Sequence, residues 1–225
     1  LNRLAGYLAE RGHTVQVIDT TGRPASTTGP EELGDWLLAN ADRYGTIGFH
    51  VNSWNINHIL RTLGRALPKL KQKPLLFGGP LPNSEPLRLT NLLAQNGIGR
   101  FGVVQGLGEK ITDEILSRRK SLASRATSAV PREELLGIEG LWAFEKGELQ
   151  RGHKVALAHD EYERTPFLSL SHNTFYQRYW KPVMDAGHLG EHAMDVIFSS
   201  QGLDVNRGCP FSCTYCSVPQ YEERL

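Results

Sequence analysis

Hydrophobic residues recur along the first half of the chain with two alternating spacings. One spacing places apolar side chains three or four positions apart, as in an amphipathic helix; the other is a short apolar or β-branched run, typical of a buried strand. The first spacing predicts helices over residues 1–11, 30–44, 56–70, 86–95 and 110–119. The second predicts strands over residues 14–19, 46–50, 74–77 and 100–104.

This alternation of strands and helices indicates a doubly wound α/β fold with a parallel sheet, because parallel strands need long, usually helical, crossovers. The first helix begins at the start of the chain, so we expect the first strand of the sheet to be missing and to precede Leu1. In such sheets ligands bind at the carboxyl ends of the strands. We therefore expect the loops after Asp19, His50, Phe77 and Val104 to form one rim.

Several of these loops are rich in glycine, asparagine or serine. Gly78 and Gly79 follow one predicted strand, and Gly106, Gly108 and Glu109 follow another. Glycine admits close approach of the backbone to a bulky ligand, although ordinary turn chemistry also explains it. His50, at a strand end, either faces the same ligand or is an ordinary solvated histidine.

The second half of the chain is less regular. From Lys120 the composition turns to Ser, Arg and Ala, as in a linker, and residues 138–150 predict a β-hairpin that flanks the first sheet. Residues 151–171 carry alternating charges, as in an extended connector. Aromatic residues over 175–180 have helical spacing, which favours core packing over stacking on nucleic-acid bases.

Composition narrows the function classes. The 225 residues include 25 basic and 24 acidic side chains, so the net charge of +1 disfavours a nucleic-acid partner. No apolar run approaches the ~20 residues that cross a bilayer, and no charged and then apolar leader opens the chain. We expect no membrane association and a cytoplasmic location. An odd number of cysteines, all in one short motif, argues against a disulfide framework.

The three cysteines all fall within residues 209–216. Clustered thiolates bind zinc or an iron–sulfur cluster, or form disulfides. A closed zinc site takes four protein ligands, and the nearest histidines, His188 and His192, lie well upstream. Three thiolates on one loop instead suit three corners of a [4Fe–4S] cluster, with one iron left open. A zinc site completed by a distant histidine and incidental free thiols are the alternatives.

The run Cys209-Pro-Phe-Ser-Cys213-Thr-Tyr215-Cys216, introduced by residues 206–208, resembles the cysteine loop of the radical S-adenosylmethionine superfamily. The resemblance implies that Cys209, Cys213 and Cys216 hold the cluster and that S-adenosylmethionine chelates the open iron, with Tyr215 near its adenine. Reductive cleavage of the sulfonium would then give a 5′-deoxyadenosyl radical, so that the cofactor carries the difficult chemistry.

The sequence LFGGP at residues 76–80, then QGLGE at 105–109, then this cysteine loop resembles the order found in cobalamin-dependent radical enzymes. The resemblance implies a flavodoxin-like cobalamin-binding domain over residues 1–119, a connector over 120–195, and the first strand and cysteine loop of a (β/α) barrel over 196–225. The residues that we expect to contact cobalamin are Asn52, Ser53, Gly78, Gly79, Gly106, Gly108 and Glu109. No Asp-x-His-x-x-Gly run occurs, so a histidine ligand to cobalt is not supported.

We therefore expect the N-terminal part of a radical S-adenosylmethionine enzyme that uses cobalamin to methylate an unactivated carbon, and that is inactive as this chain alone. The expected partners are a small-molecule or peptide substrate and a reductant such as flavodoxin or ferredoxin. The alternatives are a cobalamin-dependent radical cyclase or rearrangement enzyme, a methylthiotransferase, and a non-catalytic cobalamin carrier or sensor. Methylthiotransferases carry three further cysteines in their N-terminal domain, and residues 1–208 contain none.

Overall fold

The computed structural model of the chain describes residues 2–18, 29–71, 73–124, 135–155 and 164. The predicted cluster ligands Cys209, Cys213 and Cys216 and the predicted adenine neighbour Tyr215 lie outside these ranges, as does the predicted barrel strand.

Five strands form one mixed sheet in the order β1-β2-β3-β4-β5. The first three are parallel, and the last two are antiparallel to their neighbours. The strands are β1 (Ile47–His50), β2 (Leu75–Gly78), β3 (Arg100–Val104), β4 (Leu141–Glu145) and β5 (Glu148–Gln150). The prediction of parallel strands with interleaved helices is confirmed for β1 to β3.

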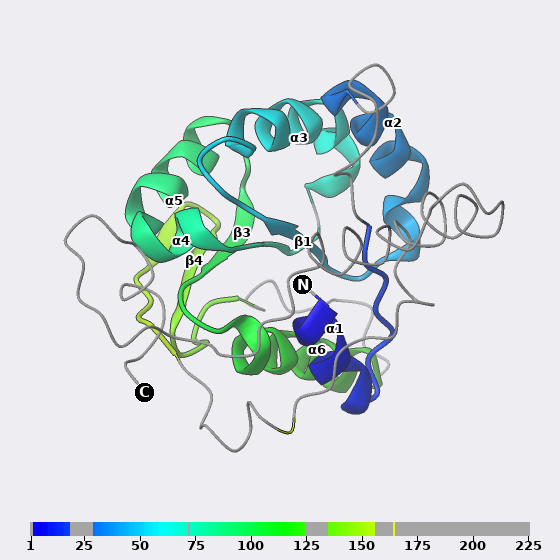
Figure 1. Cartoon of the computed structure of the whole chain (residues 1–225), viewed down its shortest axis with the longest axis vertical. Helices are drawn as coiled ribbons and strands as arrows, with labels where there is room; N and C mark the ends of the chain where they lie inside the picture. The colour runs from blue at the N-terminus through cyan, green and yellow to red at the C-terminus, as the bar shows by residue number, and fades with distance from the viewer. Residues whose placement is uncertain (1, 19–28, 72, 125–134, 156–163, 165–225) are drawn as a thin grey trace, which may run out of the picture.

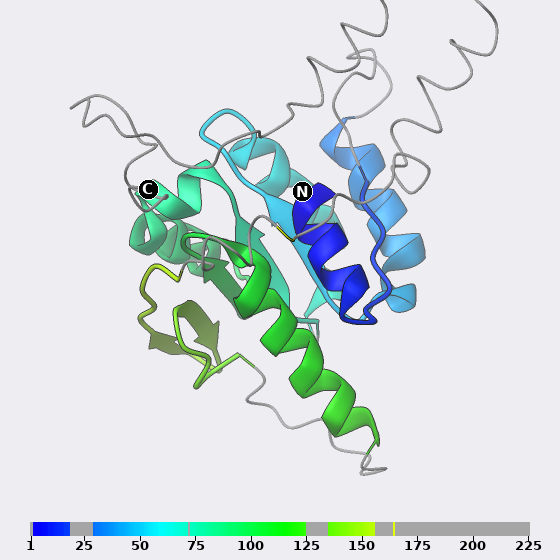
Figure 2. The same ribbon diagram turned by 60° about the horizontal axis from the view of Figure 1, so that its bottom comes forward.

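Helices cover both faces of this sheet, which is the doubly wound arrangement (Figures 1 and 2). On one side lie α2 (Pro30–Asn40) with the short η1 (Ala41–Arg43), α3 (Ile56–Leu70), α4 (Pro80–Ser84) and α5 (Pro86–Gln95). On the other side lie α1 (Asn2–Glu10) and α6 (Gly108–Ser124). All except the five-residue α4 are predicted by the hydrophobic spacing.

The alternation of side chains along the strands divides the core into two clusters. Phe77 and Phe101 point toward α3 and α5, where an aromatic row continues to Phe49 and Phe144 with ring centroids 5.3 to 6.0 Å apart. Their sequence neighbours point the opposite way, toward α6, as period-two alternation requires. The buried members of this second cluster are Leu76, Val104, Ile111, Ile115, Leu135, Ile138, Leu141 and Ala143.

The predicted hairpin is part of the sheet and does not merely flank it. β4 pairs with β3 from Arg100 opposite Glu145 to Val104 opposite Leu141, and β5 pairs with β4. The turn between β4 and β5 is formed by Lys146 and Gly147, both with positive φ. Because an antiparallel neighbour closes one side of β3, the fully parallel sheet expected from the sequence becomes a mixed one.

The strand predicted at residues 14–19 is not formed in the part of it that the structure describes. Residues 14–18 contain only one bridge residue, Val17, which is buried. A β-branched run becomes a strand only where a partner completes its hydrogen-bond ladder. Here Val17 alone of residues 14–18 forms a bridge, and a single bridge is too short to be a strand. Instead, the Gln16 side chain accepts a hydrogen bond from the Tyr44 hydroxyl.

Candidate functional site

The carboxyl ends of β1 and β2 meet at one edge of the sheet, as expected. His50 is in register with Gly78, and Phe77 is in register with Val103 near the end of β3. The chain leaves these ends through residues 51–55, through Gly79 and through residues 105–107. The predicted contact residues thus lie on a common rim, but they differ in whether a ligand can reach them.

The loop between β1 and α3 is fixed by side-chain hydrogen bonds. The backbone N–H of Asn52 donates to Asn55 Oδ1 at 2.9 Å, and the N–H of Asn55 donates to Asn52 Oδ1 at 2.8 Å. Asn55 Nδ2 also donates to the His50 carbonyl at 2.9 Å, and the Val51 N–H donates to the Gly78 carbonyl at 2.7 Å. Asn52 therefore uses its carboxamide oxygen to shape the loop, while Ser53 at its tip is exposed.

The two adjacent glycines of this rim have different surroundings. No described atom lies within 4 Å of a Cβ built on Gly78, so space beside it is open. Gly79 has a φ of 119°, and a Cβ there would lie 2.7 Å from the Val51 carbonyl oxygen. Only glycine suits that position, whatever binds nearby. The predicted role in ligand approach is therefore compatible with Gly78, whereas Gly79 is required by the turn into α4.

The part of the rim that follows β3 is occupied by the chain itself. Gly106 forms a parallel bridge with Val155, and a Cβ on Gly106 would lie 2.6 Å from the Val155 carbonyl oxygen. The Leu107 N–H donates to that same oxygen at 3.0 Å. The Glu109 side chain, in the first turn of α6, is only 1% exposed. Gly106 and Glu109 thus make internal contacts, and their role as ligand contacts stays a prediction. A Cβ built on Gly108 would meet Val104 and Thr112 at ordinary van der Waals distances.

Asn83 in α4 links the two parts of the rim, and the sequence pattern gives no sign of it. Its Oδ1 accepts a hydrogen bond from the Gly106 N–H at 2.5 Å, and its carbonyl accepts one from Gln105 Nε2 at 3.2 Å. Trp142 Nε1 in turn donates to Gln105 Oε1 at 3.2 Å. These bonds hold residues 105–107 against α4 and β4. The open part of the rim is therefore limited to residues 50–53 and Gly78, at the ends of β1 and β2.

His50 is an exposed residue at the end of β1, beside Gly78 at the end of β2. Desolvation by the surrounding protein lowers the pKa of its imidazole below the usual 6.5. The lower pKa favours the uncharged ring, which presents one donor and one acceptor nitrogen. Such a ring can hydrogen-bond a neutral polar group of a ligand without attracting anions.

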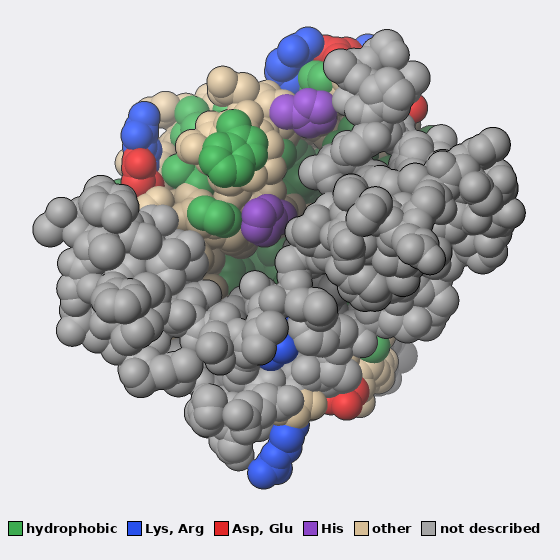
Figure 3. Space-filling model, in the orientation of Figure 1, with side chains coloured by type: hydrophobic (Ala, Val, Ile, Leu, Met, Phe, Trp, Pro, Cys, Tyr) green, Lys and Arg blue, Asp and Glu red, His purple; other side chains and the backbone are tan. Residues whose placement is uncertain are grey.

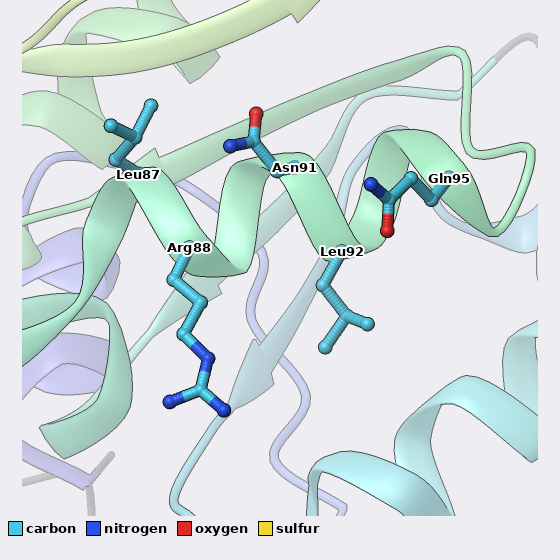
Figure 4. Close-up of a pocket in the computed structure, with 5 residues that line it drawn as sticks. All are labelled: Leu87, Arg88, Asn91, Leu92 and Gln95. Atoms are coloured by element: carbon cyan, nitrogen blue, oxygen red, sulfur yellow. The ribbon is translucent and has the colours of Figure 1, made fainter.

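Other features of the described residues point to no alternative centre. Within these ranges no group of three His, Cys, Asp or Glu side chains could hold a metal ion, and no helix could cross a membrane. A depression is lined by Leu87, Arg88, Asn91, Leu92 and Gln95, all from α5. Figure 4 shows these side chains diverging from the helix, so this is a helix surface and not a site with converging groups.

Comparisons with known proteins identify no relative. No family model matches the chain, and neither a search of curated proteins nor a search of solved structures found a match.

Proposed function

We propose that this protein is a radical S-adenosylmethionine enzyme that uses cobalamin as a second cofactor. The proposed reaction is the methylation of an unactivated carbon. The observation that carries the proposal is the spacing of Cys209, Cys213 and Cys216. Three thiolates on one loop leave one iron of a [4Fe–4S] cluster without a protein ligand, and that iron is available to S-adenosylmethionine.

The fold supports the second cofactor. A parallel α/β sheet binds ligands at the carboxyl ends of its strands. Here the end of β2 offers open space at Gly78, which pairs with His50 of β1, and the exposed Ser53 follows in the loop after β1. Cobalamin is bulky, so it needs a position such as Gly78, where no side chain projects into the space above the strand ends. When bound, cobalamin supplies a carrier for a methyl group.

The same geometry limits where the cofactor would lie. The bridge between Gly106 and Val155 and the burial of Glu109 leave the β3 end to internal packing. We therefore place the cobalamin contacts on Asn52, Ser53 and Gly78, with His50 beside them. His50 Nε2 or Nδ1 would accept or donate one hydrogen bond to the amide groups at the edge of the corrin ring.

Anaerobic reconstitution of the intact gene product with iron and sulfide tests the proposal. We expect about four irons per chain and a reducible cluster that cleaves S-adenosylmethionine. Cys213→Ala should abolish iron uptake, because two thiolates no longer hold the cluster. Ser217→Ala, next to the last cysteine, is the matched control and should keep the full iron content. Stoichiometric zinc with no iron uptake would contradict the proposal.

A further inference from the structure

Trp54 is the most exposed large hydrophobic side chain of the described residues, with 83% of its surface accessible. The other two described hydrophobic residues of this kind, Leu87 and Leu149, are each 39% exposed. Exposing a whole indole ring to water leaves far more apolar surface unburied, and so costs more free energy, than exposing a partly covered leucine. The folded core therefore does not explain why tryptophan stands at this position.

The loop that carries Trp54 is held in place and is not a loose tip. Asn52 and Asn55, on either side of it, exchange two backbone-to-side-chain hydrogen bonds of 2.9 and 2.8 Å. Asn55 is further tied to the His50 carbonyl, and Val51 to the Gly78 carbonyl. The position of Trp54 is thus fixed relative to the ends of β1 and β2. A rigid backbone lowers the entropy lost when an aromatic side chain binds a ligand.

Two glycines lie near the carboxyl ends of β1 and β2, on the same sheet face as His50. Gly48 and His50 of β1 lie on one face of the strand, and they pair with Leu76 and Gly78 of β2. No described atom lies within 4 Å of a Cβ built on Gly48 or on Gly78. Figure 3 shows histidine and hydrophobic side chains next to each other on this side of the molecule. Ligand sites are lined mainly by apolar and aromatic side chains with a few polar groups, and an exposed indole beside an imidazole and two glycines is compatible with a flat, mainly apolar ring.

From these observations we infer that the Trp54 indole contacts the face of a large, flat, conjugated ring bound at the open part of the rim. The inference rests on the proposed function for the identity of that ring, which is the corrin of cobalamin. Trp54 contributes apolar contact and stacking, and the glycines leave room for the ring edge. Trp54 is thus a binding residue that determines affinity for the flat ligand.

Equilibrium dialysis of the intact gene product against hydroxocobalamin tests this inference. Trp54→Ala should weaken binding about tenfold or more, a loss typical of a removed aromatic stacking partner, whereas Trp54→Phe should retain most of the affinity. Leu149→Ala, which removes another exposed apolar side chain on β5, is the control and should bind like the unaltered protein. Equal urea midpoints for all variants would show that folding is unchanged.

A parallel dialysis against flavin mononucleotide separates the inference from the proposed function, because flavin is another flat ring that α/β sheets bind at this edge. Hydroxocobalamin binding that Trp54→Ala leaves unchanged overturns the inference and leaves the proposed function standing. Flavin binding that Trp54→Ala weakens, with no cobalamin binding, supports the stacking role and overturns the proposed function. Binding of neither compound overturns both.

Discussion

At the scale of single residues, the two glycines at the end of β2 have separable roles. The φ of 119° at Gly79 and the 2.7 Å approach to the Val51 carbonyl oxygen mean that Gly79→Ala strains the backbone. We expect it to lower the free energy of unfolding by about 1–3 kcal/mol. Gly78→Leu projects into open space, so we expect no such loss but at least about tenfold weaker cobalamin binding, as the side chain fills the rim.

The matched control for Gly78→Leu is Gly99→Leu. Gly99 also has no described atom within 4 Å of its Cβ position, but it precedes β3 at the amino end of the strand, at the sheet edge opposite to the rim. Urea unfolding and hydroxocobalamin dialysis of the three variants are the measurements. Weakened binding by Gly99→Leu, or unchanged binding by Gly78→Leu, would contradict a cobalamin site at this edge.

His50 predicts a pH dependence whose sign follows from desolvation. Its pKa is lower in the folded protein than the 6.5 expected for the unfolded chain. As the pH falls through about 6.5, the unfolded state takes up a proton before the folded state does, so stability decreases until the folded pKa is reached. At higher pH, His50 is uncharged in both states and does not change the free energy of unfolding with pH. His50→Asn should reduce this decrease in urea unfolding measured between about pH 7.5 and about pH 5; an unchanged pH profile would refute it.

Sequence alone could place these residues on a rim but could not sort them. A Gly-Gly pair after a strand identifies the turn, yet only the backbone torsions show that Gly79 needs glycine and Gly78 does not. Likewise, the QGLGE run gives no sign that Val155, about 50 residues later, pairs with Gly106. Long-range contacts of this kind have no local sequence pattern. The cysteine motif, in contrast, is local and can be interpreted from its spacing alone.

At the scale of elements, periodicity succeeded where one face of an element packs against a core. α3 and α5 have the predicted bounds, since their apolar positions repeat over whole turns. The run at residues 14–18 is β-branched too, but only Val17 forms a bridge there, because propensity does not decide how far pairing extends. The sequence also did not predict a mixed sheet. The residues of a hairpin show that two strands pair with each other, but not which third strand they pair with.

The junction of β3 and β4 contains a buried ion pair that we expect to hold the hairpin on the sheet. Arg100 Nε lies 2.7 Å from Glu145 Oε1, and the two side chains are 13% and 3% exposed. Arg100→Met removes the positive partner of a buried carboxylate, so we expect a loss of about 3–5 kcal/mol in the free energy of unfolding.

The double variant Arg100→Met with Glu145→Leu should recover most of that loss, because it removes both charges and fills the space with apolar atoms. Urea unfolding of the single and double variants measures the difference. A double variant as unstable as Arg100→Met alone would show that the hairpin is held by shape and not by charge compensation.

At the scale of the whole molecule, the two faces of the sheet are closed by different parts of the chain. One face is covered by α2, α3 and α5, which lie close in sequence to strands β1, β2 and β3. The other face is covered by α6 together with residues 135–155. The turn after α1 is joined to α6 by a hydrogen bond of 2.7 Å between His13 Nε2 and Asp113 Oδ1. The second face therefore depends on a segment that the sequence assigned to a connector.

This dependence predicts that the α/β unit is stable only when the hairpin is included. Leu135, Ile138 and Leu141 are fully buried on the second face. Burial of such side chains contributes about 1.5–3 kcal/mol each, and their sum is comparable with the 5–15 kcal/mol of a typical domain. We expect residues 1–119 to show no cooperative urea transition, whereas residues 1–155 should unfold cooperatively. Equal transitions for both would mean that the helices and parallel strands form an independent core, and that residues 120–155 are a connector after all.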